Sequence, residues 1–274
     1  MRKNMVAAVV ILYNWNQENI DNINSYASYF DEIILIDNSD KKVQIKLNPD
    51  FTYFSFNENL GIATALNKGI EIAREHGMEY VVTMDQDSRF KNNIVEIYFQ
   101  KMKLITNNQF ILSPNYIVDY QKTSSSYSEL EEIYWTAQSG CLFPISIFDQ
   151  LGNFKEDFFI DVVDYEYCIR AKNNGIKVIR VNNAEIFHKP GETKQKKILG
   201  KRIEFASHNQ VRIYYQVRNL LWSFINYKEF SFFKVYFRIF IKILLLFDNK
   251  ISYLKYFFKG TKDAIGNKLG KLVQ

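Results

Sequence analysis

Cysteine is scarce in this chain, with Cys141 and Cys168 the only two among 274 residues. Two cysteines cannot build a disulfide framework, and a reducing cytoplasmic location is the simplest expectation. Long apolar runs are also missing. The best candidate, residues 235–247, is interrupted by Arg238 and Lys242 and is shorter than the roughly 18 residues of a membrane-spanning helix.

Acidic residues are rare in the C-terminal part of the chain. Residues 1–193 hold 18 Lys and Arg against 26 Asp and Glu, a net charge of −8, whereas residues 194–274 hold 17 against 4, a net charge of +13. This asymmetry predicts a basic segment with an anionic partner. Repeats and low-complexity linkers are absent from the sequence, and its length suits one large core, or one domain with an appendage.

Strand-like and helix-like segments alternate over the first 105 residues. Short apolar runs predict buried strands, and apolar residues three or four apart predict helices between them. Such alternation predicts a parallel sheet with right-handed crossovers. Predicted strands are residues 6–13, 33–36, 51–56, 80–84, 111–114, 116–120 and 176–181, and predicted helices are residues 17–29, 60–75, 92–105, 165–174 and much of the chain after residue 209.

Polar side chains follow the first four predicted strands. Ligands of open α/β sheets gather outside the carboxyl ends of the strands, so these corners together predict a nucleotide site. Taken singly, each corner is more easily explained as a turn or a cap. An aromatic ring could stack on a base, a carboxylate could accept the imide N–H of uracil or thymine, and a glycine allows close backbone approach. The corner residues are Tyr13, Asn14, Asp37, Asn59, Gly61, Asp85, Gln86 and Asp87.

Asp85 and Asp87 stand two residues apart, directly behind the strand at residues 80–84. Two such carboxylates can hold Mg²⁺ or Mn²⁺ through oxygen, and the cation can neutralise a diphosphate. The plainer alternative is a loop with two solvated Asp residues. His188, one of three histidines, could complete the metal site as a neutral imidazole or could be structural.

A second group of acids lies at residues 161–166. Asp161 and Asp164 are surrounded by apolar residues. A carboxylate in partly apolar surroundings holds its proton more tightly, which suits a general base. Either residue could instead cap the helix that follows.

The ordered series of motifs resembles the family 2 inverting glycosyltransferases with a GT-A fold, and in particular their bacterial rhamnosyltransferase branch. Asp85-Gln86-Asp87-Ser88 and the segment Phe159–Glu166 are the forms typical of that branch. The resemblance covers residues 6–219 and implies an α/β fold with a mostly parallel central sheet flanked by helices. The other matching segments are residues 9–14, 36–39, 59–69, 139–142 and 214–219.

This resemblance also implies roles for the donor-site residues. Tyr13 and Asp37 would hold the pyrimidine, and Asp85 would contact the ribose or the sugar. Asp87 would bind Mg²⁺ or Mn²⁺, with His188 assisting at the metal or the diphosphate.

For the base, the resemblance implies Asp164, and Arg218 would contact phosphate. The family usually has Glu-Asp before the helix. Here Val163 holds the first of these two positions and Asp161 lies three residues before Asp164. The choice between the two aspartates as catalytic base therefore stays open at this point.

The function that follows is transfer of a sugar with inversion at its anomeric carbon. The best match is L-rhamnose from dTDP-rhamnose, moved to a lipid-linked or oligosaccharide acceptor of a bacterial cell-surface polysaccharide. One alternative keeps the fold and uses another dTDP- or UDP-hexose. A second alternative is an inactive sugar-nucleotide-binding scaffold.

The expected domains are a catalytic domain at 1–208, with a nucleotide-binding half at 1–107 and an acceptor-binding half at 108–208, and a helical extension at 209–274.

The basic extension is also rich in aromatic residues. Lys234, Arg238 and Lys242 are spaced four residues apart, as on one helix face, with Phe, Tyr, Leu and Ile around them. Such a segment is typical of helices that lie on a membrane surface, so we expect peripheral attachment through residues 228–262 to the inner face of the plasma membrane. The alternative is packing on the catalytic domain or in a homodimer interface. Nucleic-acid binding is disfavoured by the acidic N-terminal part.

Overall fold

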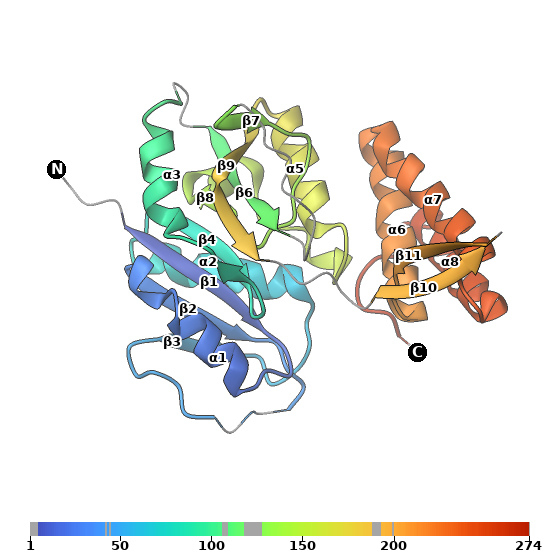
Figure 1. The fold of residues 1–274 in the computed structure, drawn as a ribbon, viewed down its shortest axis with the longest axis horizontal. Coiled ribbons are helices and arrows are strands. Elements are labelled where there is room, and N and C mark those ends of the chain that lie inside the picture. The colour runs from blue at the N-terminus through green and yellow to red at the C-terminus, as the bar shows by residue number, and fades with distance from the viewer. Residues whose placement is uncertain are drawn as a thin grey trace.

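The computed structural model describes residues 5–41, 43, 45–105, 109–117, 128–187, 193–198 and 200–273. It has an α/β part built on one large sheet and a C-terminal group of three helices with a two-stranded hairpin (Figure 1). The predicted α/β class with a helical extension is confirmed.

The N-terminal half of the sheet is parallel, as the alternating pattern predicts. Its strands lie in the order β3-β2-β1-β4, and helix α2 packs on β1 and β2. The elements are β1 (Val6–Leu12), α1 (Gln17–Asn24), the short 3₁₀ helix η1 (Ala27–Tyr29), β2 (Glu32–Asp37), β3 (Thr52–Ser55), α2 (Ile62–Glu75) and β4 (Tyr80–Asp85).

The second half of the sheet departs from this regularity. A short strand, β8, runs antiparallel between β4 and β6, and β9 continues the sheet parallel to β6. Strands β5, β7 and β8 and helix α4 are missed from sequence because two to six residues are too few to show a period. The elements are β5 (Arg89–Phe90), α3 (Ile94–Met102), β6 (Phe110–Ile117), β7 (Leu130–Glu132), β8 (Leu142–Pro144), α4 (Ser146–Leu151), η2 (Glu156–Phe158), α5 (Val163–Asn173) and β9 (Lys177–Phe187).

A single strand, β6, replaces the two strands predicted around Pro114. The register with β9 shifts between Pro114 and Asn115, and this irregularity makes the sequence look like two segments. The part of the second predicted strand after Ile117 lies outside the described residues.

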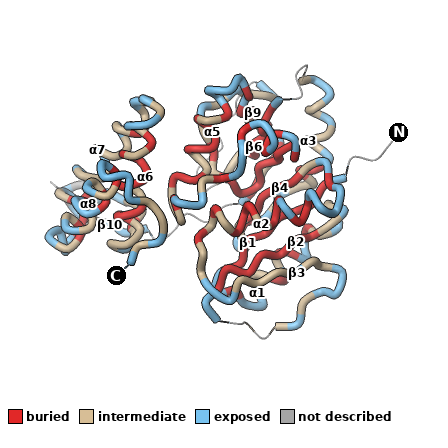
Figure 2. The backbone as a smooth tube through the Cα atoms, turned by 180° about the vertical axis from the view of Figure 1, so that it is seen from behind, coloured by how far each residue is buried: buried red, intermediate tan, exposed pale blue. Residues whose placement is uncertain are grey.

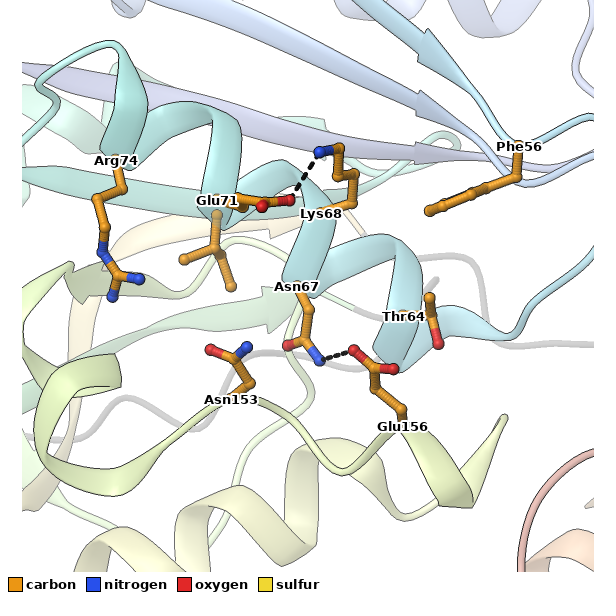
Figure 3. A pocket seen from close by; sticks show the side chains of 9 residues that line it. Phe56, Thr64, Asn67, Lys68, Glu71, Arg74, Asn153 and Glu156 are labelled. Atoms are coloured by element: carbon orange, nitrogen blue, oxygen red, sulfur yellow. Dashed lines mark hydrogen bonds and ion pairs between the residues drawn. The ribbon is translucent and has the colours of Figure 1, made fainter.

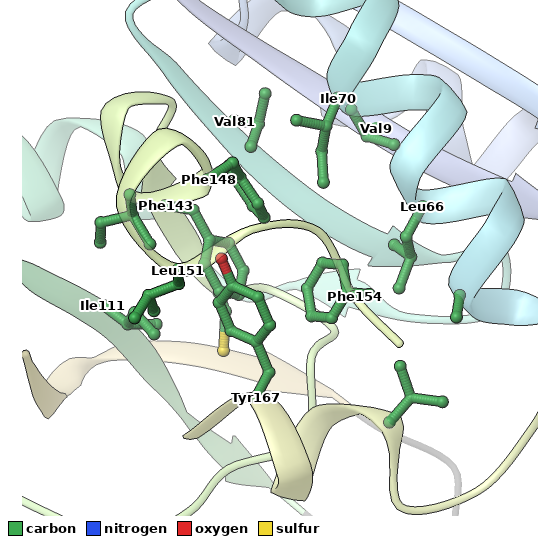
Figure 4. Packing of buried hydrophobic residues seen from close by; sticks show 14 of the residues in the cluster. Val9, Leu66, Ile70, Val81, Ile111, Phe143, Phe148, Leu151, Phe154 and Tyr167 are labelled. Atoms are coloured by element: carbon green, nitrogen blue, oxygen red, sulfur yellow. The ribbon is translucent and has the colours of Figure 1, made fainter. Parts of the chain in front are cut away.

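Two clusters of buried apolar residues pack on the sheet. Figure 2 shows that most of β1 and β4 is buried. On one face, Leu66 and Ile70 of α2 point toward β1 and β4, as the apolar spacing of residues 60–75 predicts (Figure 4). Tyr167 of α5 packs on Phe154, with ring centroids 4.4 Å apart. Helix α5 is thereby fixed to the core just after its N-terminus.

The C-terminal group packs on the α/β part through its first helix, α6. Trp222 of α6 meets the ring of Phe158 edge-on, with centroids 5.5 Å apart. Gly260 of α8 lies so close to α6 that an added Cβ would be 2.7 Å from the carbonyl oxygen of Tyr214. The elements are β10 (Thr193–Ile198), β11 (Lys201–Ala206), α6 (Gln210–Tyr227), α7 (Phe230–Leu246) and α8 (Lys250–Ile265).

The β10–β11 hairpin is not predicted from sequence, and its contacts are with the C-terminal helices. Phe205 packs against Phe247, with centroids 5.7 Å apart, and Lys196 Nζ donates to the carbonyl of Leu246 at 3.0 Å. We therefore propose that the C-terminal unit begins near residue 193 instead of residue 209.

Lys242 does not share an exposed face with Lys234 and Arg238, which corrects the expectation from their spacing. Its Nζ donates to the carbonyl of Ala206 and lies over the rings of Phe205 and Phe247. Residues eight apart on an α-helix are rotated by about 80°, and the hairpin covers that side. In the described residues, the structure contains no helix long and apolar enough to cross a membrane.

Candidate active site

Two of the predicted acidic residues flank the carboxyl end of β1. The sheet register pairs Leu12 with Asp37 and Ile11 with Asp85. This edge of the sheet therefore gathers the corners that sequence analysis assigns to a nucleotide sugar.

Gln86, which follows β4, forms hydrogen bonds with Tyr13, which follows β1. Its side-chain oxygen accepts the backbone N–H of Tyr13 at 2.8 Å, and its side-chain nitrogen donates to the Tyr13 carbonyl at 3.1 Å. The amide of Asn22 donates to the Gln86 carbonyl at 3.1 Å, and the N–H of Asn14 donates to Ser39 Oγ at 2.8 Å. The backbone of Tyr13 is held in place while its ring stays 43% exposed, free to stack on a ligand.

Asp37 is fully buried. Its carboxylate accepts hydrogen bonds from Trp15 Nε1 at 2.9 Å, the Tyr53 hydroxyl at 2.8 Å and the N–H of Ser39 at 2.9 Å. In this structure the Asp37 carboxylate accepts hydrogen bonds from protein donors, and its contact with a pyrimidine stays a prediction.

Polar side chains also hold the loop between β3 and α2, which contains Asn59 and Gly61. Asn59 Oδ1 accepts from the N–H of Gly61 at 3.0 Å and from Asn38 Nδ2 at 3.2 Å. Gly61 has a φ of +92°, and an added Cβ would lie 2.5 Å from the carbonyl oxygen of Phe159. The close approach that this glycine allows is therefore to the chain just before α5.

Asp85 belongs to a polar group at the end of β4. Gln138 Nε2 donates to Asp85 Oδ1 at 2.6 Å, and the Asp85 N–H donates to Ser139 Oγ at 3.0 Å. Gln138 also borders, together with Asp164, a small cavity of about 10 Å³. Asp87 is exposed two residues farther on.

Asp161 and Asp164 have different environments. Arg212 of α6 binds Asp161 through two hydrogen bonds of 2.6 and 2.7 Å. Asp164 lies in the first turn of α5 and accepts the N–H of Tyr165 at 3.0 Å. Burial raises the pKa of Asp164 to about 7; the hydrogen bond from Tyr165 opposes this shift, and the charges of Asp85 and Asp161 add to it.

Val162 occupies the N-cap position of α5, with a φ of +68°, and its side chain makes no capping bond. Neither aspartate is therefore the N-cap residue, although Asp164 satisfies one N–H of the first turn, that of Tyr165.

Arg212 and Gln138 are site residues that sequence analysis missed. Burial would lower the pKa of Arg212, but its hydrogen bonds and charge interaction with Asp161 raise it, and Asp164 and Asp85 add to the effect. These four charged groups therefore lie within electrostatic reach of one another. Gln138 directly precedes the Ser139-Gly140 motif, whereas nothing local distinguishes Arg212 from other basic residues of the C-terminal part.

Arg218 lies away from these groups, buried under the surface of α6 with no exposed area. Its guanidinium donates to the carbonyls of Asp157, Phe158 and Gly270 at 2.6 to 3.0 Å. A phosphate contact would require several of these bonds to break. In this structure the guanidinium of Arg218 is therefore directed at backbone carbonyls, and not at the place where the donor phosphate is predicted.

Asp85 and Asp87 are the described residues of the predicted Mg²⁺ or Mn²⁺ site; such ions prefer oxygen ligands and often take the rest from a diphosphate and water. His188, the third predicted ligand, lies outside the described residues. Among the residues that are described, there is no group of three or more His, Cys, Asp or Glu side chains arranged to hold a metal.

The family model described as "Glycosyl transferase family 2" matches residues 8–153, which carry most of the sheet and the acidic corners. This chain belongs to that family. The resemblance found in the sequence is thereby confirmed, and the match covers more than half of the chain.

This family 2 chain is also similar to a curated protein, the dTDP-rhamnosyl transferase RfbF of Shigella flexneri. The two are 28% identical over 300 aligned positions, which cover 95% of each chain.

Solved structures agree with the family 2 fold. A crystal structure of GalNAc-T7 with UDP, GalNAc and Mn²⁺ superposes with a TM-score of 0.61 at 13% identity, covering 96% of this chain and 56% of that one. A crystal structure of S. aureus TarS 1–349 with UDP-GlcNAc has a TM-score of 0.61 at 11% identity, covering 96% and 83%. The first comparison spans little more than half of the larger protein. At these identities the likeness concerns the fold.

A larger cavity of about 390 Å³ lies along the outer side of α2 in this family 2 enzyme (Figure 3). Part of its polar lining is paired within the cavity: Lys68 bonds to Glu71 at 2.7 Å, and Asn67 bonds to Glu156 at 2.8 Å. None of the acidic residues at the strand ends lines it, so it is separate from the candidate active site.

Proposed function

We propose that this family 2 enzyme transfers L-rhamnose from dTDP-rhamnose to a lipid-linked or oligosaccharide acceptor, with inversion at the anomeric carbon. The observation that carries the proposal is the environment of Asp164. A half-buried carboxylate whose pKa is raised to about 7 stands beside the acidic end of β4. Such a group can take a proton near neutral pH, as a general base must.

The proposed reaction is a single displacement. The acceptor hydroxyl gives its proton to Asp164 while its oxygen bonds to the anomeric carbon of the donor. The bond between that carbon and the diphosphate oxygen breaks on the opposite face, and its electron pair leaves with the nucleoside diphosphate. Fixing both sugars in this geometry lowers the entropic cost of the reaction.

Asp85 and Asp87 would hold Mg²⁺ or Mn²⁺, and the bound cation would supply positive charge to the leaving diphosphate. Asp161 is already neutralised by Arg212, which favours Asp164 as the base. Tyr13, with its exposed ring, would stack on the base of the donor.

Rhamnose as the donor sugar is supported by the likeness to RfbF over 95% of both chains. Another dTDP- or UDP-hexose remains the alternative, because sugar selectivity depends on pocket shape. The alternative of an inactive scaffold is disfavoured by the presence of Asp85, Asp87 and Asp164 together.

A panel of dTDP- and UDP-sugars tests the donor, with Mn²⁺ present and with thermal shift and donor hydrolysis as readouts. We expect the largest shift and the fastest hydrolysis with dTDP-rhamnose. Faster hydrolysis of a UDP-hexose would favour the alternative donor, and binding without hydrolysis of any donor would favour the scaffold.

We also propose that the C-terminal helices place the enzyme on the inner face of the plasma membrane, where a lipid-linked acceptor would be found. Every exposed side chain of α7 and α8 is apolar or basic. These residues are Phe230, Lys234, Phe237, Arg238, Ile241 and Leu245 on α7, and Lys250, Ile251, Lys255, Phe258, Lys259, Lys262 and Ile265 on α8.

The two exposed faces adjoin through aromatic contacts. The ring of Phe240 lies 6.3 Å from that of Phe237 and 6.5 Å from that of Phe258, centroid to centroid. Apolar side chains would enter the boundary between headgroups and acyl chains, and each basic residue near an anionic surface would add about 1 kcal/mol. An anionic bilayer is the partner that fits this combination.

A further inference from the structure

The chain between η2 and α5 has an unusual conformation just before the proposed base. Phe159, Asp161 and Val162 have φ angles of +64°, +65° and +68°. Residues other than glycine rarely adopt this region, and a β-branched residue such as valine is an outlier there. Such a conformation persists only where the surrounding structure imposes it.

Helix α6 supplies much of that surrounding structure. Asn219 Nδ2 donates to the carbonyls of Phe158, Ile160 and Asp161 at 3.1, 3.0 and 2.8 Å. Arg218 Nη2 donates to the carbonyls of Asp157 and Phe158, both at 3.0 Å. Four carbonyls of the segment 157–161 are therefore held by two adjacent side chains.

These two side chains also orient each other. Arg218 Nε donates to Asn219 Oδ1 at 2.9 Å, which turns the amide nitrogen of Asn219 toward the segment. Both residues are fully buried. The other hydrogen bonds of the Arg218 guanidinium go to backbone carbonyls.

The C-terminal residues complete the arrangement. Arg218 Nη1 donates to the carbonyl of Gly270 at 2.6 Å, and the N–H of Gly270 donates to the carbonyl of Asp157 at 2.7 Å. Segment 157–161 is thus bound by α6 and by the end of the chain. The remaining carbonyl, that of Phe159, accepts the N–H of Ile62 at 2.7 Å.

We propose that Arg218 and Asn219 are positioning residues for glycosyl transfer. By holding the carbonyls of residues 157–161 in this conformation, they fix the point at which α5 begins and hence the carboxylate of Asp164. This inference rests on the proposed function of Asp164 and assigns the Arg218-Asn219 pair to the base instead of the donor phosphates.

The test uses the full chain with Asn219→Ala, which removes three of the bonds, and Arg218→Lys, which keeps the charge. Tyr214→Phe is the matched control, because it removes a 2.9 Å bond from the same helix to Asp263 of α8 and leaves the segment untouched. If Asn219→Ala does not fold, Arg218→Lys takes its place, because an ammonium cannot reproduce all of the guanidinium bonds to Asp157, Phe158 and Gly270.

We expect kcat of Asn219→Ala to fall about 100-fold, since a misplacement of about 1 Å can have this effect. The affinity for dTDP with Mn²⁺ should change less than about threefold, and Arg218→Lys should be intermediate. Tyr214→Phe should keep the kcat of the unmodified enzyme. If Asn219→Ala loses activity only in proportion to the fraction of protein that folds, kcat per folded molecule is unchanged. That result would overturn the inference.

The ¹³C carboxyl titration of Asp164 gives a readout that needs no turnover. We expect the midpoint in Asn219→Ala to move toward the ordinary aspartate range, because a loosened segment admits water. An unchanged midpoint would count against the inference even if kcat fell. Full activity of Asp164→Asn would instead overturn the proposed function, and the two failures are thereby distinguished.

Discussion

Arg212 binds both carboxylate oxygens of Asp161, with Nη2 2.6 Å from Oδ1 and Nε 2.7 Å from Oδ2. This ion pair neutralises one of the two aspartates that the sequence offers as a catalytic base. The other, Asp164, lies in the first turn of α5 with a raised pKa. The pair therefore favours Asp164 where the sequence leaves the choice open.

Replacement of the proposed base should abolish most of the activity. We expect Asp164→Asn to lower kcat by about 10²- to 10⁴-fold, the usual effect of losing a positioned general base, with folding intact. Product formation from dTDP-rhamnose, measured beside circular dichroism, checks this. Asp161→Asn is the comparison, and its kcat should fall less, because the substitution disturbs Arg212 but leaves the base. A larger fall of kcat in Asp161→Asn would indicate that Asp161 is the base.

Activity should depend on pH in the neutral range. Asp164 must be deprotonated to accept a proton, and its pKa is raised to about 7 by burial. We expect kcat/KM to fall about tenfold per pH unit below this value. A pH–rate profile between pH 5 and 9 measures it, and a flat profile through that range would contradict the role of Asp164.

The raised pKa of Asp164 should also make folding stability depend on pH. Between an ordinary aspartate pKa of 3.8 and about 7, the folded chain keeps the proton that the unfolded chain has released. Folding stability therefore decreases as pH rises through this interval. Asparagine does not titrate, so Asp164→Asn should not lose this stability as pH rises. The Tm of the variant relative to that of the unmodified protein should therefore be a few degrees higher at pH 8 than at pH 4. Calorimetry at both pH values decides it.

Metal removal should stop turnover. Asp85 and Asp87 leave a bound cation to take further ligands from the diphosphate and water, so we expect EDTA to abolish activity and Mn²⁺ or Mg²⁺ to restore it. Asp87→Asn should need a higher Mn²⁺ concentration for half-maximal rate. Full turnover in EDTA would remove Asp87 from its proposed role.

Membrane binding should depend on the exposed apolar residues of α7. Phe237 and Leu245 are 52% and 56% exposed, and we expect Phe237→Ser with Leu245→Ser to weaken binding to phosphatidylglycerol vesicles by roughly tenfold or more. Co-sedimentation measures it. Leu104→Ser, at an equally exposed leucine of the α/β part, is the control. Equal binding of the unmodified protein and the double variant would count against the membrane proposal.

Point variants suit this measurement better than removal of the helices. A chain ending at residue 226 would also lose Lys271, whose Nζ donates to the Asn59 carbonyl at 2.8 Å, and Gly270, which binds Asp157. Such a truncation would alter the candidate active site as well as the surface that we propose binds the membrane.

Local patterns predicted the parallel half of the sheet well, because β1, β2 and β4 are continuous apolar runs and α2 has a regular apolar face. The antiparallel strand β8 was not predictable, since its three residues have no period and pair only through contacts distant in sequence. The same holds for Gln138 and Arg212, whose roles depend on Asp85 and Asp161, 53 and 51 positions away.

By itself, the sequence determined the family, the parallel strands and the acidic corners, because apolar periodicity and short motifs are local properties of the chain. Only the tertiary structure decided which of the two aspartates keeps a raised pKa, and that Arg218 faces backbone carbonyls. The first depends on the burial of Asp164, and the second on hydrogen bonds from α6 to Phe158 and Gly270. Both arise from contacts between segments that are distant in the sequence.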